Sequence, residues 1–153
     1  MKALELKIPP PAALLVIVGA MWAVSLAGPS LGLRDPIRIV VAGTIALFGL
    51  GIDLFSAISF RRARTTVNAM KPEKTSVLVT SGAYRFSRNP MYVGLVFVLV
   101  AWAMFLSSAW ALVGPLVFVL YINRFQIVPE ERVLMVTFGP TYSAYKSSVR
   151  RWI

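Results

Sequence analysis

Four long apolar segments constrain the fold of this chain more than any other feature of its sequence. They cover residues 12–28, 37–60, 91–106 and 109–128, and Asp53 is the one acidic residue inside them. A helix needs about 20 apolar residues to cross a bilayer, so each segment has roughly the length of one crossing. The apolar residues form blocks rather than amphipathic periods, which predicts an integral membrane protein.

The lengths of these segments set the domain organisation. We expect an all-α, polytopic membrane protein with about four transmembrane helices and short C-terminal helices that are cytoplasmic or interfacial. Residues 1–153 then form a single domain, with two membrane helices in 1–60 and a loop, a helical hairpin and C-terminal helices in 61–153. Only Ser107 and Ser108 separate the third segment from the fourth, which predicts a tight antiparallel hairpin. A cleaved signal peptide over the first segment is the alternative, and it would leave three helices.

The charged residues indicate the orientation in the membrane. The chain has 16 Lys and Arg against 6 Asp and Glu, and all its basic residues except Arg34 and Arg38 lie on one side of the four-helix arrangement. Lys and Arg collect on the cytoplasmic side, so both termini and the long loop are expected in the cytoplasm, at the inner or plasma membrane if the host is bacterial. The basic residues would meet anionic lipids, and no nucleic-acid partner is expected.

The residue types that are missing exclude several kinds of chemistry. The chain contains no Cys and no His. Thiol nucleophiles, disulfides, histidine bases and Cys/His metal sites are therefore excluded, and no metal is expected.

Two further segments have alternative explanations. Gly49-Leu50-Gly51-Ile52-Asp53 is a weak match to a nucleotide-binding glycine turn, and the small residues more simply allow close helix packing. Asp53 must find a partner or line a polar cavity. Near the C-terminus, a short helix over 130–138 should end at Gly139-Pro140, and a second helix should follow. That helix would place one aromatic face in the lipid headgroups or over a pocket formed by the loop; this face comprises Tyr142, Tyr145, Val149 and Trp152.

Two polar clusters flank the hairpin. One is Arg88-Asn89-Pro90-Met91-Tyr92-Val93-Gly94, and the other is the pair Glu130 and Glu131. Each alone could be a membrane-entry segment or a favourable helix start. The short turn, however, brings the start of the third segment and the end of the fourth to the same membrane face. A basic group with aromatic side chains opposite a carboxylate suits a zwitterionic ligand with a ribose and a flat base. Neighbouring helical residues lie about 100° apart, so only one of the two acids should face that ligand.

These motifs, in this order, resemble the integral-membrane methyltransferases that include isoprenylcysteine carboxyl methyltransferases and phospholipid methyltransferases, as in small bacterial-type members. The similarity covers roughly the last ninety residues. It runs through Thr65-Thr66-Val67-Asn68, Leu78-Val79-Thr80-Ser81-Gly82-Ala83-Tyr84, the Arg88 motif, Pro129-Glu130-Glu131 and Phe138-Gly139-Pro140-Thr141-Tyr142-Ser143-Ala144-Tyr145-Lys146.

The resemblance implies an S-adenosylmethionine-dependent methyltransferase that acts at the cytoplasmic face on a lipophilic acceptor: an isoprenylcysteine-type carboxylate, a phospholipid amine or a small thiol. The implied cofactor contacts are Ser76, Val77, Leu78, Val79, Tyr84, Asn89, Pro90, Met91, Tyr92 and Glu130. Arg88 would pair with the methionine carboxylate or with Glu131, and Arg124 would orient the acceptor head; these three are the candidate catalytic residues. A non-catalytic assembly or lipid-binding protein of the same fold is the alternative.

Two positions depart from the isoprenylcysteine enzymes. Those enzymes usually have His where this chain has Asn89, and Arg where it has Gln126. Arg124 lies two residues earlier and would be the substitute for the missing Arg. Of the three acceptor classes, the isoprenylcysteine-type carboxylate is therefore less favoured than the other two.

Overall fold

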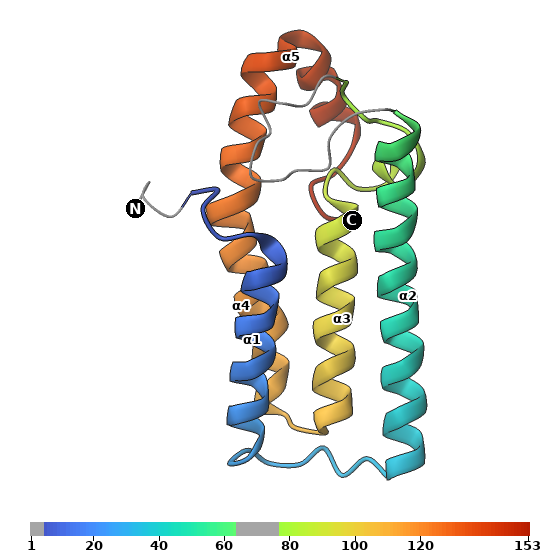
Figure 1. The fold of residues 1–153 in the computed structure, drawn as a ribbon, viewed down its shortest axis with the longest axis vertical. Coiled ribbons are helices and arrows are strands. Elements are labelled where there is room, and N and C mark those ends of the chain that lie inside the picture. The colour runs from blue at the N-terminus through green and yellow to red at the C-terminus, as the bar shows by residue number, and fades with distance from the viewer. Residues whose placement is uncertain (1–4, 64–76) are drawn as a thin grey trace.

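The computed structural model describes residues 5–63 and 77–153 of the chain, and these are helical with no strands (Figure 1). The prediction of an all-α fold is confirmed. The helices are α1 (Pro10–Ser25), α2 (Asp35–Arg62), η3 (Gly82–Arg85), α3 (Pro90–Leu106), η4 (Trp110–Leu112), α4 (Val113–Ile122), η5 (Asn123–Ile127) and α5 (Val128–Ser148).

Two of these helices are long and apolar enough to cross a membrane. They are α2, with 28 residues, and the continuous helical stretch Trp110–Ser148, with 39 residues. The other two apolar helices, α1 and α3, have 16 and 17 residues. For them, a membrane crossing stays a prediction.

The hairpin turn expected at Ser107 and Ser108 is present. Ser107 has a left-handed backbone, with φ 49° and ψ 40°, and ends α3. The connection between α1 and α2 lies beside this turn, because the Leu31 amide donates to the Ser107 carbonyl at 2.8 Å and the Ala109 amide donates to the Pro29 carbonyl at 3.1 Å. Two chain connections thus occupy one end of the molecule, and η3, the start of α3, α5 and the C-terminus gather at the other (Figure 1).

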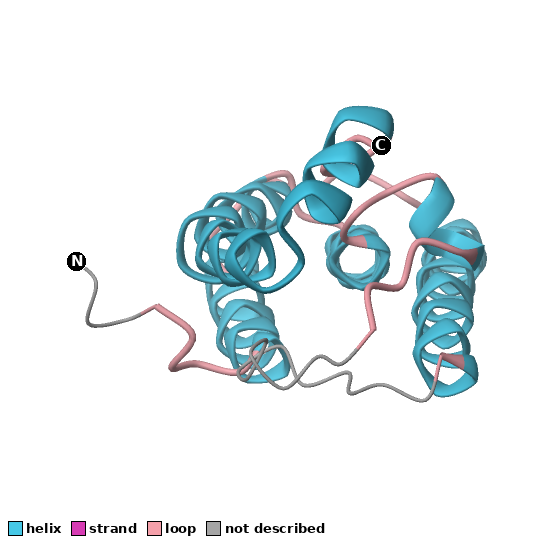
Figure 2. Cartoon of the chain, turned by 90° about the horizontal axis from the view of Figure 1, so that it is seen from above, coloured by secondary structure: helices cyan, strands magenta, loops and turns pink. Residues whose placement is uncertain are grey.

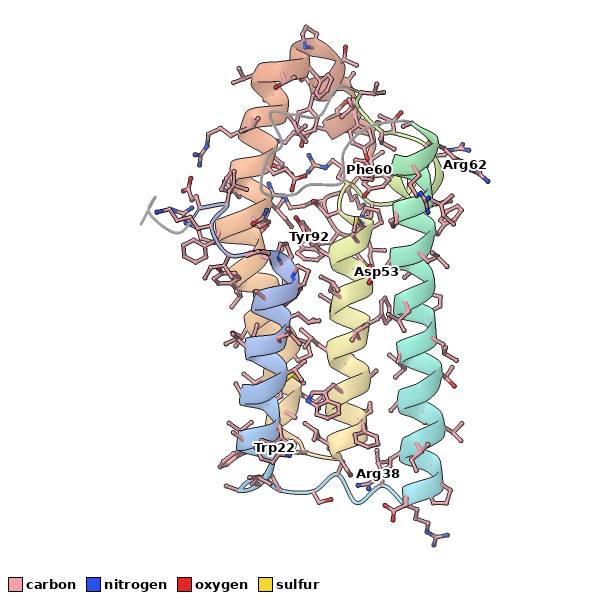
Figure 3. The ribbon with its side chains drawn as sticks, in the orientation of Figure 1. Trp22, Arg38, Asp53, Phe60, Arg62 and Tyr92 are labelled. Atoms are coloured by element: carbon pink, nitrogen blue, oxygen red, sulfur yellow. The ribbon has the colours of Figure 1, made fainter. Side chains whose placement is uncertain are left out.

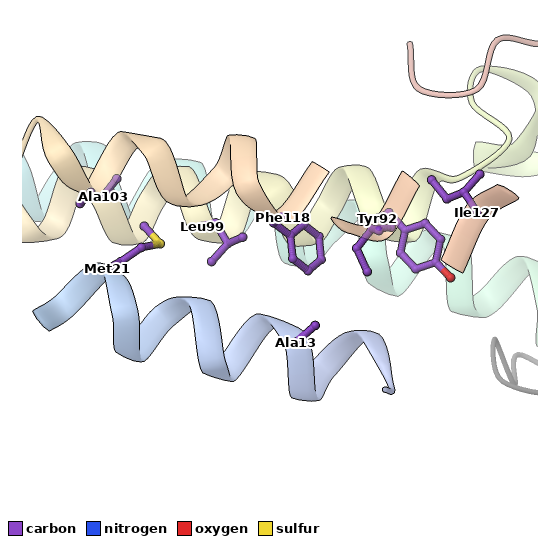
Figure 4. Packing of buried hydrophobic residues seen from close by; sticks show 9 residues of the cluster. Ala13, Met21, Tyr92, Leu99, Ala103, Phe118 and Ile127 are labelled. Atoms are coloured by element: carbon purple, nitrogen blue, oxygen red, sulfur yellow. The ribbon is translucent and has the colours of Figure 1, made fainter. Parts of the chain in front are cut away.

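The main core lies between α1, α3 and α4. Met21, Leu99, Phe118 and Ile127 are among its fully or almost fully buried side chains (Figure 4). Seen along the bundle, α2 stands to one side (Figure 2), and it packs against α3 and η3. This arrangement leaves most of the α2 surface uncovered by protein.

Small residues allow α2 to approach α3 closely. A Cβ on Gly49 would lie 2.7 Å from the Gly94 carbonyl oxygen and 2.9 Å from the Cβ of Phe97. Gly49 therefore has the packing role predicted from the sequence. Gly51 does not, because nothing lies within 4 Å of its position for a Cβ.

The last long helix changes its winding twice. Between α4 and α5, η5 is one turn of π-helix, and inside α5 the backbone breaks at Gly139, with φ 46° and ψ −120°. The predicted end of a helix at Gly139 is thus confirmed. The predicted aromatic face is wrong beyond Tyr145, because the helix ends at Ser148 and Val149 is extended. Trp152 packs against the core.

Candidate functional site

The start of α3 and the start of α5 meet at the end of the bundle that also holds η3 and the C-terminus, which we call the loop end (Figure 1). Pro90 is the first residue of α3. A backbone N–H at that position would have no acceptor within the helix, so a proline, which lacks the N–H, is tolerated there. The Tyr92 hydroxyl then donates to Oε2 of Glu130 at 3.3 Å, and Tyr92 itself is buried (Figure 3). The prediction that the two polar clusters are neighbours is confirmed.

Glu131 faces a different set of groups from Glu130. Its carboxylate lies 2.7 Å from Nη2 of Arg151, 3.2 Å from Nη1 of Arg88 and 3.7 Å from Nζ of Lys146. The side chains of Glu131 and Arg88 are only 10% and 9% exposed. We call these four residues the Glu131 cluster. The three basic side chains of this cluster already neutralise the Glu131 carboxylate, whereas Glu130 has a neutral phenol as its partner.

The C-terminal segment holds the Arg88 motif in place. The Arg88 amide donates to the Arg150 carbonyl at 2.9 Å, and Nδ2 of Asn89 donates to the Arg151 carbonyl at 3.0 Å. The Arg151 side chain also donates to Oδ1 of Asn123 in the π turn, at 3.0 Å. Sequence reasoning missed Arg151, because nothing in the sequence indicates that residues 149–153 fold back over the start of α3.

Tyr84 anchors the loop before α3. Its buried ring meets the ring of Phe60 edge to face, with centroids 5.2 Å apart, and its carbonyl accepts a hydrogen bond from the Tyr145 hydroxyl at 2.7 Å. Burial raises the pKa of both phenols, so both stay protonated. Tyr145, on the aromatic face of the C-terminal helix, therefore contacts the segment before α3, which agrees with one of the two alternatives; a pocket there stays a prediction. Gly82, with φ +63°, makes the turn that precedes Tyr84.

The remaining residues that the resemblance implies as cofactor contacts differ in their exposure to solvent. Val77 is exposed, Leu78 is half-buried and Val79 is buried. Pro90 is buried and Met91 is half-buried in the first turn of α3. Ser76 and the motif at 65–68 lie outside the described residues.

Arg124 lies apart from the Glu131 cluster. Its guanidinium donates to Oε1 of Glu5 at 3.0 Å, and Arg132 donates to Oε2 of the same carboxylate at 3.2 Å. The hydrogen bond from Arg124 is the largest influence that lowers the pKa of Glu5. Gln126, at the position where the isoprenylcysteine enzymes have Arg, is buried and interacts with Tyr92. Contact of Arg124 with an acceptor stays a prediction.

The arrangement supplies hydrogen-bond acceptors and aromatic surface at one place. Glu130 is a half-buried carboxylate beside the Tyr92 phenol, and after burial its charge is a further cause of the raised pKa of Tyr84. Such a set can accept hydrogen bonds from hydroxyl or ammonium groups and can pack against a flat or cationic ligand.

Comparison with known proteins identifies the family. The family model described as phospholipid methyltransferase matches residues 37–141, more than half of the chain. An uncharacterized protein of Haemophilus influenzae is 44% identical over 63 residues, which are 41% of this chain and 100% of that protein. No solved structure matches. The family and the two long apolar helices indicate a membrane-associated methyltransferase. This chain belongs to the phospholipid methyltransferase family.

Proposed function

We propose that this protein is an S-adenosylmethionine-dependent methyltransferase that acts at the membrane surface on a lipophilic acceptor. The observation that carries the proposal is the hydrogen bond between Tyr92 and Glu130, which joins the entry of α3 to the entry of α5. It sets a carboxylate and a phenol side by side, and both residues lie within 37–141, the range that the family model matches.

The residues present fit this cofactor. A carboxylate such as Glu130 can accept hydrogen bonds from a ribose or from an ammonium group, and Tyr92 and Tyr84 offer aromatic surface for an adenine or a sulfonium. Glu131 is already neutralised by its cluster, so Glu130 is the acid left for a ligand. The proposed cofactor contacts are Ser76, Val77, Leu78, Val79, Tyr84, Asn89, Pro90, Met91, Tyr92 and Glu130.

The proposed topology has four crossings, by α1, α2, α3 and the α4 helix, with both termini in the cytoplasm. Arg62 and Arg38 lie at opposite ends of α2 (Figure 3). Apart from Arg34 and Arg38, the described basic residues belong to position 7 and to the segments 61–62, 85–88, 124–132 and 146–151. The positive-inside tendency then places the loop end, and the site, on the cytoplasmic side.

The chemistry requires positioning more than acid or base groups. When bound, the cofactor supplies an electrophilic methyl group on a sulfonium. Tyr92, Glu130 and the loop would fix its orientation for in-line attack, and the cover formed by Tyr145 would exclude water. The contacts of Arg88 with Glu131 hold the entry of α3. Arg124 would orient a polar acceptor head whose tail stays in lipid.

Isothermal titration of S-adenosylmethionine into the detergent-solubilised protein tests the proposal. We expect Glu130→Gln to weaken binding by about tenfold or more, since a hydrogen bond to a charged group contributes about 1.5–3 kcal/mol. Tyr92→Phe should weaken it by about threefold to tenfold, and Tyr121→Phe, the same change within α4, should leave it unaltered.

Two results would count against the proposal. Absence of binding by the unaltered protein, or equal binding by the Glu130→Gln variant, would refute the cofactor site. Binding without transfer of a radiolabelled methyl group to membrane lipids or prenylated thiols would favour the non-catalytic alternative.

A further inference from the structure

The last residues of the chain end beside the site proposed for the cofactor. After α5, residues 149–153 turn back, and the C-terminus lies beside the start of α3 (Figure 1). The carbonyl of Arg151 accepts two hydrogen bonds there, one from Nδ2 of Asn89 at 3.0 Å and one from the Ser87 hydroxyl at 3.3 Å. The backbone at Arg151 is therefore fixed to the segment that begins α3.

The side chain of Arg151 binds two further elements, the π turn and α5. Its Nε and Nη2 atoms donate to the two carboxylate oxygens of Glu131, at 3.0 and 2.7 Å. A planar guanidinium makes such a two-point contact, and an ammonium does not. The Nη1 atom donates to Oδ1 of Asn123 at 3.0 Å. All three nitrogens thus have acceptors within the protein, so the guanidinium is satisfied without a ligand.

The two acceptors of this guanidinium lie eight positions apart. Asn123 is the first residue of the π turn, and Glu131 belongs to the first turn of α5. In a regular α-helix, residues at this spacing differ by about 80° around the axis. A π turn takes up one extra residue, which reduces the difference to about 20° and brings both side chains to one face. Binding of both residues by Arg151 therefore favours the π turn over a continuous α-helix.

The position of Glu130 depends on the winding before α5. Neighbouring residues of a helix lie about 100° apart, so fixing Glu131 also fixes the direction of Glu130. In that direction Glu130 accepts the hydrogen bond from the Tyr92 hydroxyl, at 3.3 Å. Tyr92 lies in the first turn of α3, directly after the Asn89 side chain that binds the Arg151 carbonyl. One residue thus fixes the elements that carry both members of the Tyr92–Glu130 pair.

We infer that Arg151 is a positioning residue for cofactor binding, an inference that rests on the proposed function. Its backbone fixes the start of α3, and its side chain fixes the π turn and α5, so that Tyr92 and Glu130 face each other where the ligand binds. The geometry of the guanidinium carries this role, and its charge alone does not. Arg151→Lys keeps a positive charge beside Glu131 but loses the planar group that binds Glu131 and Asn123 together.

Isothermal titration with S-adenosylmethionine compares Arg151→Lys with Arg150→Lys, the same substitution at the exposed neighbouring residue. We expect Arg151→Lys to weaken binding by about tenfold to 10²-fold, since small displacements of positioned groups have effects of up to that size. Arg150→Lys should leave binding unaltered. Asn123→Ala removes the acceptor in the π turn and keeps the Glu131 contacts, and it should weaken binding by about threefold to tenfold. Unaltered binding in Arg151→Lys or in Asn123→Ala would overturn the inference.

A double-mutant cycle separates positioning from a general loss of stability. Arg151 acts on the cofactor through the position of Glu130, so residues 130 and 151 should be energetically coupled. In a protein that already carries Glu130→Gln, Arg151→Lys should therefore weaken binding much less than it does in the unaltered protein. The same fold-loss in both proteins would show that Arg151 acts independently of Glu130, and this result would overturn the inference.

A cross-link measures the same geometry without the cofactor. The chain has no Cys, so Tyr92→Cys and Glu130→Cys introduce its only two thiols, which a short bismaleimide can join. The cross-link should form readily when Arg151 is present, and its yield should fall severalfold in Arg151→Lys but not in Arg150→Lys. Equal yields would overturn the inference. Failure of the unaltered protein to bind S-adenosylmethionine, with a cross-link that still depends on Arg151, would instead refute the proposed function.

Discussion

Loss of the Glu131 charge should loosen the entry of α3 far more than loss of any one of its outer partners. In Glu131→Gln, the shape of the side chain is kept, but Arg88, which is 9% exposed, remains beside it without an anion. Removing one member of a buried ion pair costs about 3–5 kcal/mol. Because Arg151 and Lys146 are 32% and 43% exposed and stay partly hydrated, we take the lower end, about 3 kcal/mol.

The magnitude can be measured as thermal unfolding in detergent. A chain of this size loses about 2–4 °C of Tm per kcal/mol, so Glu131→Gln should lower Tm by about 6–12 °C. Lys146→Gln is the matched control: its ion pair is exposed and long, at 3.7 Å, and contributes about 0.5 kcal/mol, or about 1–2 °C. Equal Tm values for the two variants would refute this reasoning.

Hydrogen exchange gives a local measurement of the same change. The Arg88 amide donates to the Arg150 carbonyl at 2.9 Å, and that contact depends on the C-terminal segment held by Glu131 through Arg151. The Arg88 amide should therefore exchange faster in Glu131→Gln but not in Lys146→Gln. Unchanged protection in Glu131→Gln would show that the backbone contacts hold the segment alone.

Two further changes test the packing around the site. Gly49→Ala should destabilise the protein by about 1–3 kcal/mol, since its Cβ would lie 2.7 Å from the Gly94 carbonyl oxygen; Gly51→Ala, which meets nothing within 4 Å, should be neutral or stabilising in the same unfolding assay. Tyr145→Phe should cost about 1 kcal/mol because the buried Tyr84 carbonyl loses a 2.7 Å hydrogen bond, and titration should show weaker S-adenosylmethionine binding. Unchanged stability in Gly49→Ala, or unchanged binding in Tyr145→Phe, would contradict these assignments.

Sequence patterns predicted the helices and the meeting of the two polar clusters because both follow from local rules. The length of the apolar segments predicts the helices. A turn of only two residues requires the helices on either side of it to run antiparallel, which brings their far ends together. The expectation that only one acid faces the ligand site follows from helical spacing, and the structure separates the two: Glu130 meets Tyr92, and Glu131 meets Arg88.

Contacts between segments far apart in the chain could not be predicted from these local sequence patterns. Arg151 has the same sequence appearance as any basic residue near a membrane surface, yet it joins Glu131, Asn123 and the backbone at Asn89. Likewise, the pairing of Arg124 with Glu5 links residues 119 positions apart. Each depends on a chain path that only tertiary structure fixes.

The π turn at Asn123–Ile127 has a consequence for how the length of this chain can vary. A π turn holds one residue more than an α turn, so the residues after it keep the angular positions they would have in a regular helix one residue shorter. Wound as a continuous α-helix, the present sequence would rotate its later residues by about 100° and turn Pro129 toward Tyr92 in place of Glu130. A one-residue deletion within 123–127 should therefore leave the carboxylate where it is. The same deletion just after the turn should displace it.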